Sequence, residues 1–209
     1  MLALAGSVSA ATINFDDQGL IGPGVFIDAS PIPQTLSIAA GGVTAVFTGG
    51  VILTDAFLMP ANLTSIYGTA DSASVGADGM SNPLTITFSA PITNFLVDVL
   101  NGLPANIQYR VSDNAGNASV FTLAPNTSSG ATTIGFAAAG TQVQIASITA
   151  PTTTWDFFID NIRFNTGIQC GTTGCNEVAA IPVPGALPLF AAGLAVLGAG
   201  VYRRRTLKA

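Results

Sequence analysis

Residues 11–164 form short runs of β-branched and aromatic residues separated by clusters of Gly, Pro, Asn and Asp. In residues 84–88 the apolar Leu84, Ile86 and Phe88 alternate with two threonines. This period of two is typical of antiparallel strands with one face buried and one face in water. The same region shows no helical period of 3.6 residues. We therefore expect an all-β body of many short strands joined by turns.

Nine strands are predicted, at residues 12–15, 43–47, 84–88, 95–100, 107–111, 119–123, 132–136, 143–148 and 157–164. Residues 113–117 (Asp-Asn-Ala-Gly-Asn) predict a hairpin turn, because Asn and Gly tolerate a positive φ. This number of short strands favours an antiparallel two-sheet sandwich of the jelly-roll type.

Charge is scarce and unevenly distributed along the chain. The 209 residues allow one sizeable core, and only 8% of them are charged, against roughly 25% in an average soluble domain. All eleven acidic residues lie between Asp16 and Glu177, and four of the six basic residues lie in the last seven positions. An acidic body argues against nucleic acid as a partner, whereas the basic end suits a membrane surface.

The chain has two cysteines, Cys170 and Cys175, and no histidine. These are too few ligands for a zinc site. We expect a local disulfide formed in an oxidising compartment, with two free thiols as the alternative.

Both ends of the chain carry export signals. Residues 1–10 are interpreted as the remnant of a signal peptide, since Val8-Ser9-Ala10 fits the small-residue cleavage pattern; an apolar first strand is the alternative. Residues 186–202 contain no charge and would span about 26 Å as a helix. Arg203, Arg204 and Arg205 follow directly and predict a transmembrane helix with its C-terminus in the cytoplasm. A buried core helix is the alternative.

The C-terminal segment resembles a known sorting signal. The proline-rich motif around Val183, Pro184, Gly185 and Ala186, the Gly/Ala-rich segment and the basic end together resemble PEP-CTERM tails, closest to the VPLPA type. The chain departs from the family pattern in having no Glu between prolines and in having glycine at position 185. The resemblance implies recognition by an exosortase, a membrane protease, and export to a bacterial surface where exopolysaccharide is produced. A plain anchor that is never processed is the alternative.

Residues 13–17 and 158–164 also resemble the first and last strands of lectin-like and carbohydrate-binding jelly rolls. Asp16, Asp17 and Asp160 would meet if these strands are neighbours, and carboxylates are ligands that calcium prefers. They are candidates for a structural calcium site, with a solvated turn and a bent last strand as the alternative. Three aromatic residues could stack on sugar rings: Trp155, Tyr67 and Tyr109. Single aromatic residues are more often part of the core, so the core role is favoured.

No catalytic residues are predicted, because the chain lacks His and has a single Glu and a single Lys, so the usual nucleophile–base pairs cannot be assembled. The expected organisation is a signal remnant (1–10), a β-sandwich ectodomain (11–165), a linker with the disulfide loop (166–180) and the sorting tail (181–209). The expected function is that of an exported, non-enzymatic envelope or extracellular-matrix protein. The alternative is a lectin-like module that binds exopolysaccharide.

Overall fold

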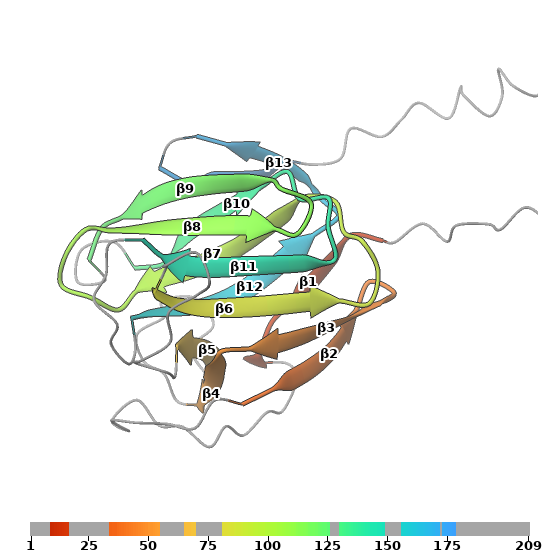
Figure 1. Ribbon diagram of the computed structural model, residues 1–209, viewed down its shortest axis with the longest axis horizontal. Coiled ribbons are helices and arrows are strands. Elements are labelled where there is room, and N and C mark those ends of the chain that lie inside the picture. The colour runs from red at the N-terminus through yellow and green to blue at the C-terminus, as the bar shows by residue number, and fades with distance from the viewer. Residues whose placement is uncertain are drawn as a thin grey trace, which may run out of the picture. The chain divides into compact units, whose positions relative to one another are not determined.

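The computed structural model describes residues 9–16, 34–54, 65–69, 81–125, 130–148, 156–171 and 173–178 (Figure 1). Their regular elements are all strands, so the predicted all-β body is confirmed. No helix among these residues is long and apolar enough to cross a membrane. The sorting motif at Val183–Ala186, the Arg203–Arg205 cluster and Asp17 lie outside the described residues, as do Trp155 and most of the signal remnant.

Two antiparallel six-stranded sheets lie face to face (Figure 1). Sheet A has the order β10-β7-β12-β5-β4, with β1 also paired to β12: β10 (Thr132–Phe136), β7 (Phe95–Asn101), β12 (Phe157–Phe164), β5 (Ser65–Thr69), β4 (Gly50–Thr54) and β1 (Ala11–Ile13). Sheet B has the order β2-β3-β6-β11-β8-β9: β2 (Leu36–Ala40), β3 (Val43–Thr48), β6 (Ser81–Phe88), β11 (Gln142–Ser147), β8 (Ile107–Asp113) and β9 (Ala118–Leu123).

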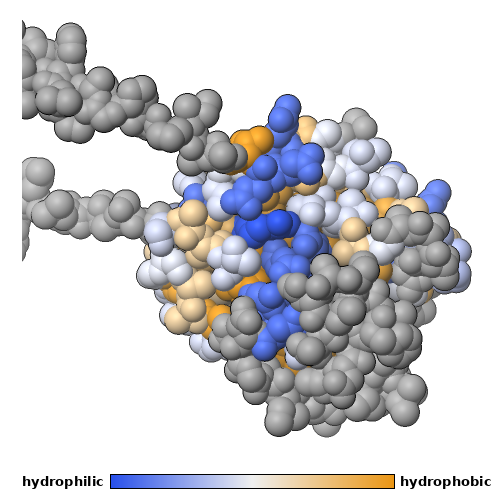
Figure 2. Space-filling model, turned by 180° about the vertical axis from the view of Figure 1, so that it is seen from behind, coloured by the Kyte–Doolittle hydropathy of each residue, from blue (hydrophilic) through white to orange (hydrophobic). Residues whose placement is uncertain are grey.

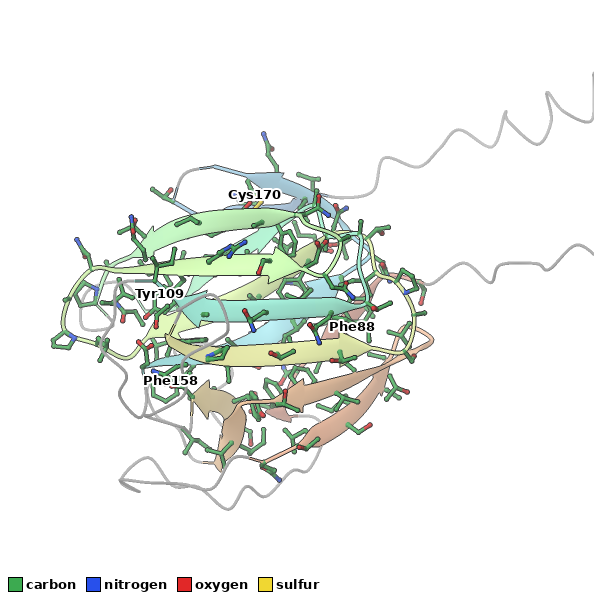
Figure 3. All side chains as sticks on the ribbon, in the orientation of Figure 1. Phe88, Tyr109, Phe158 and Cys170 are labelled. Atoms are coloured by element: carbon green, nitrogen blue, oxygen red, sulfur yellow. A yellow bond between two sulfur atoms is a disulfide. The ribbon has the colours of Figure 1, made fainter. Side chains whose placement is uncertain are left out.

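The core lies between the sheets and is built from the alternating apolar residues. Phe88 of sheet B meets Phe164 of sheet A with ring centroids 5.1 Å apart, and Tyr109 meets Phe157 at 5.2 Å. Phe88 and Tyr109 are labelled in Figure 3. Tyr67 and Tyr109 are fully buried, so neither offers a ring to a sugar. The core role favoured for them is confirmed.

All nine predicted strands are present, with ends shifted by up to three residues. The predicted turn at Asp113–Asn117 joins β8 to β9, with Gly116 at a φ of 95°. The sequence did not predict β2, β4 and β5, nor the two strands β13 (Gly167–Cys170) and β14 (Cys175–Val178). Strand β5 is buried on both faces, so its residues show no alternation. Its Gly68 is required because a Cβ there would lie 2.7 Å from the Phe158 ring.

Residues 166–180, expected as a linker with a disulfide loop, contain the hairpin β13 (Gly167–Cys170) and β14 (Cys175–Val178). Cys170 and Cys175 are direct register partners and form the predicted disulfide, drawn as a yellow bond in Figure 3. Both sulfur atoms contact the carbonyl oxygen of Gly135 on the edge strand β10, at 3.6 and 3.4 Å. Cys175 is buried against the core, so the hairpin packs on the sandwich.

Candidate functional site

The outer face of sheet A carries a second apolar cluster beside a group of carboxylates. Leu53, Ile66, Leu100 and Phe158 form the cluster and are almost completely buried, although they point away from the core between the sheets. Figure 2 shows the molecule from this side, where a band of hydrophilic residues crosses the face between more apolar areas. Charged groups on this face therefore lie next to a low-polarity surface.

Asp160 is the most deeply buried of these carboxylates, with 1% of its surface exposed. It stands on β12 two residues after Phe158 and directly across from Asp98 of β7. A register irregularity follows it between Asp160 and Arg163, and Asn161 there has a φ of 47°. Among the described residues its Oδ1 atom has no hydrogen-bond partner.

The pKa of Asp160 is raised to about 6, chiefly because burial removes water from the carboxylate. The negative charges of Asp16 and Asp98 raise it further, and hydrogen bonds from the backbone of Asn161 and Phe15 act against the shift. The site therefore favours either a proton or a cation at Asp160.

Asp16, the second calcium candidate, lies near Asp160 because β1 pairs with the end of β12. Its Oδ1 accepts a hydrogen bond from the backbone N–H of Ser65 at 2.5 Å, and its own N–H donates to Asn14 Oδ1 at 2.8 Å. Asp16 thus ties the first strand to the start of β5. Two of the three predicted calcium candidates are brought together, and Asp17 lies outside the described residues.

Asp98 is already paired with a cation. Its Oδ1 lies 2.7 Å from Arg163 Nη2 and accepts a hydrogen bond from Thr133 Oγ1 at 2.6 Å. Arg163 therefore pairs with Asp98, and no described cation pairs with Asp160. No group of three or more His, Cys, Asp or Glu side chains in the described ranges is arranged to hold a metal. Calcium binding stays a prediction that rests on Asp16 and Asp160.

A buried polar network, which the sequence did not reveal, ties the two sheets at one end. Asp156, fully buried just before β12, accepts hydrogen bonds from Ser147 Oγ and from Asn82 Nδ2. Tyr109 Oη donates to Asn101 Oδ1 at 2.9 Å. Burial raises the pKa of Asp156, and the hydrogen bonds from Ser147 and Asn82 act in the opposite direction. Because solvent does not reach Asp156, we assign the network a structural role.

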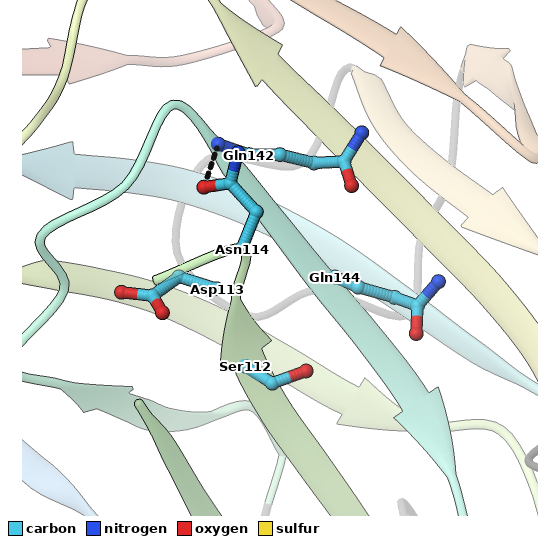
Figure 4. Close-up of a pocket in the computed structure, with 5 residues that line it drawn as sticks. All are labelled: Ser112, Asp113, Asn114, Gln142 and Gln144. Carbon is cyan, nitrogen blue, oxygen red and sulfur yellow. Dashed lines mark hydrogen bonds between the residues drawn. The ribbon is translucent and has the colours of Figure 1, made fainter. Parts of the chain in front are cut away.

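Sheet B carries a shallow polar pocket of about 120 Å³ on its outer side (Figure 4). It is lined by Ser112, Asp113 and Asn114 from β8 and the turn that follows, and by Gln142 and Gln144 from β11. Gln142 and Gln144 extend from β11 in the same direction, whereas the Asp113 carboxylate points the other way (Figure 4). None of the described residues that line this pocket is aromatic.

Comparison with known proteins adds no assignment. No protein-family model matches the chain, and no curated protein matches it either.

Proposed function

We propose that this chain is an exported, non-enzymatic envelope or extracellular-matrix protein, sorted and processed through its C-terminal tail. The observation that carries the proposal is the disulfide between Cys170 and Cys175, which closes the last described hairpin. Disulfides form and persist in oxidising compartments, outside the cytoplasm. The hairpin ends at Val178, five residues before Val183, where the sorting motif begins.

The tail supplies the sorting part of the proposal. Residues 186–202 form a single transmembrane helix with Arg203–Arg205 on the cytoplasmic side of the bacterial inner membrane. An exosortase-type membrane protease recognises Val183–Ala186 and releases the sandwich to the cell surface or the extracellular matrix. This assignment rests on the resemblance of the tail to PEP-CTERM signals.

The finer fold assignment is a jelly roll. Strands β5 to β12 contribute the order β5-β12-β7-β10 to one sheet and β6-β11-β8-β9 to the other. Successive strands thus change sheets, except for the hairpin β8–β9. Jelly rolls of this kind occur in lectin domains, which supports the second candidate function.

That second candidate is a lectin-like module that binds exopolysaccharide. The specific observation in its favour is the polar pocket of Figure 4, whose lining side chains are amides, a hydroxyl and one carboxylate. Such groups exchange hydrogen bonds with sugar hydroxyls.

Sorting is tested by fractionating cells that express the full chain and measuring the intact mass of the protein in each fraction. We expect a processed form outside the inner membrane. Changing Val183 and Pro184 to Ala should leave a full-length form in the membrane, whereas neutral residues at Arg203–Arg205 should weaken membrane retention. If both variants are processed and located like the wild type, the sorting proposal is wrong.

Export into an oxidising compartment has an independent test. The native protein should take up no thiol label before reduction and label at both cysteines after reduction and unfolding. Quantitative labelling of Cys170 and Cys175 without reduction would contradict the proposed location.

A further inference from the structure

We propose that the pocket between β8 and β11 binds the hydroxyl groups of a neutral polysaccharide, with the Gln142 and Gln144 amides and the Ser112 hydroxyl as the contact groups. The inference rests on the second candidate function and names the ligand-binding site and the ligand class for it.

The geometry of the contact groups follows from the strand register. Gln142 and Gln144 are two residues apart on β11, so their amides point to the same side of the sheet about 7 Å apart along the strand. Ser112 of β8 lies directly across from Gln144. Thr85 and Thr87 of β6 flank the same two glutamines on the other side. Amides and hydroxyls therefore stand in two rows across three neighbouring strands.

These groups retain hydrogen-bonding capacity for a ligand. Within the described part of the chain, the side chains of Gln144 and Ser112 make no hydrogen bond, and the Gln142 amide makes a long one of 3.4 Å to Thr87 Oγ1. Each amide offers two donors and an acceptor, and a hydroxyl offers both functions. A sugar diol, which also donates and accepts hydrogen bonds, is complementary to these amide and hydroxyl groups.

The end wall of the pocket is held in place by its own hydrogen bonds. Asn114 Oδ1 accepts from the backbone N–H groups of Thr141 and Gln142, at 2.9 and 3.2 Å (Figure 4). The Asp113 carboxylate accepts from three backbone N–H groups and from the Asn117 amide. A wall fixed in this way loses little conformational entropy when a ligand binds.

Charge selects a neutral ligand. Asp113, a pocket residue, carries a negative charge that would repel uronate or sulfate groups. Arg110 is the one charged side chain among the outward-facing described residues of β6, β8 and β11, and it pairs with Ala146 one row beyond Gln144. Asp113 points away from the two glutamines (Figure 4), and the side chains directly beside them, on Thr85, Thr87 and Ser112, are uncharged.

The experiment measures retardation of the full chain by native affinity electrophoresis in gels that contain dextran, galactomannan or alginate. We expect retardation by at least one of the two neutral polysaccharides and none by the polyuronate. Gln144→Ala should lower the apparent affinity at least tenfold. Thr122→Ala, which removes an exposed hydroxyl from β9 of the same sheet, should leave it unchanged, as should Arg110→Gln. Thermal melting of each variant checks that the fold is kept.

The outcomes separate the inference from the proposed function. Retardation by neither neutral polysaccharide, or by alginate alone, overturns the inference. Binding of dextran or galactomannan that Gln144→Ala does not weaken keeps the lectin function but removes this pocket as its site. Failure of the sorting proposal is seen in the fractionation experiment and is independent of these gels.

Discussion

The outer faces of the two sheets have opposite character. On sheet A, Phe158 and Asp160 point away from the core and are still almost completely buried. On sheet B, the corresponding outward positions of β11 are Gln142, which is exposed, and Gln144, which is partly exposed. Both sheets have an apolar inner face, so the inner faces do not distinguish them. The two sheets differ in whether their outward-facing side chains are exposed to solvent.

Two carboxylates show the consequence. Asp160 on sheet A has a raised pKa, because burial is the dominant influence on it. Asp113, the last residue of β8 in sheet B, is partly buried; burial raises its pKa, but hydrogen bonds from Asn117, Ala139 and Ala115 together outweigh burial and lower it. The same residue type therefore shows opposite pH behaviour at Asp160, where burial dominates, and at Asp113, where hydrogen bonds together outweigh burial.

The largest expected effect is the loss of a buried ring on sheet A. Phe158→Ala should lower the free energy of unfolding by about 3–5 kcal/mol, because it removes a fully buried side chain from the cluster with Leu100 and Ile66. Gln144→Ala on sheet B is the matched control and should change it by less than about 0.5 kcal/mol. Chemical denaturation of the full chain measures both. Equal effects of the two substitutions would show that the faces do not differ in burial.

The next effect is the pH dependence contributed by Asp160. Its folded pKa of about 6 lies above the ordinary value of 3.8, so the folded state binds the proton more tightly than the unfolded state. The stabilisation is present below the unfolded pKa and is lost as pH rises through about 6. The expected loss is on the order of 2–3 kcal/mol.

Asp160→Asn should flatten the stability curve between pH 4 and 7 and raise stability at pH 7. Denaturation midpoints across this range are the measurement. Asp16 and the Asp98–Arg163 pair face Asp160 and remain in the variant, so a curve as steep as that of the wild type would assign the pH dependence to them or to Asp156.

Alternation helped to predict strands such as β6 and β8, but it does not account for every outcome: β7 and β12 were predicted although they are buried on both faces over most of their length, and β2 was missed although it alternates. Apolar and polar residues alternate in β6 and β8 because one face of each strand is buried and the other is exposed to solvent. In β5 both faces are buried, because the outer face of sheet A is covered, and its pattern Ser-Ile-Tyr-Gly-Thr has no period. Whether the outer face of a sheet is buried depends on the tertiary structure, so the sequence of a single strand gives little indication of it.

The candidate sites are limited in the same way, because contacts that depend on strand register cannot be predicted from the local sequence. Asp16 and Asp160 were paired correctly, because neighbouring first and last strands bring them together. Asp98 was missed, since only the register of β7 against β12 places it beside Asp160. The pocket residues Gln142 and Gln144 were missed because two exposed glutamines on a strand are unremarkable until Ser112 is known to lie across from them.

A third prediction concerns calcium at Asp160 and Asp16. A cation that binds only the folded state adds about 1.4 kcal/mol of stability at ten times its Kd. It would also provide the Oδ1 atom of Asp160 with a partner. Thermal melting of the full chain with millimolar calcium or with chelator measures the shift, and Asp160→Asn should abolish it. Superimposable wild-type curves would remove the calcium site and leave a protonatable carboxylate on sheet A.

The smallest effect is expected on sheet B, at Asp113. The Oδ1 atom of Asp113 accepts from the backbone N–H groups of Ala115 and Asn117, and Oδ2 accepts from Ala139 N–H and the Asn117 amide. Asp113→Asn replaces one of these oxygens by an amide donor and should cost about 1 kcal/mol or less, because the group is partly exposed to water, which screens its charge.

The pH dependence of this cost in stability distinguishes Asp113 from Asp160. Since the folded pKa of Asp113 is lowered, its stabilisation is present above the unfolded pKa and is lost as pH falls through the folded one, opposite in sign to Asp160. Wild type and Asp113→Asn should therefore differ in denaturation midpoint at pH 6 and converge below pH 3. In the double variant with Asp160→Asn the two effects should add, because the carboxylates lie on different sheets. A constant difference across the whole pH range would mean that the turn, and not the charge of Asp113, supplies the stabilisation.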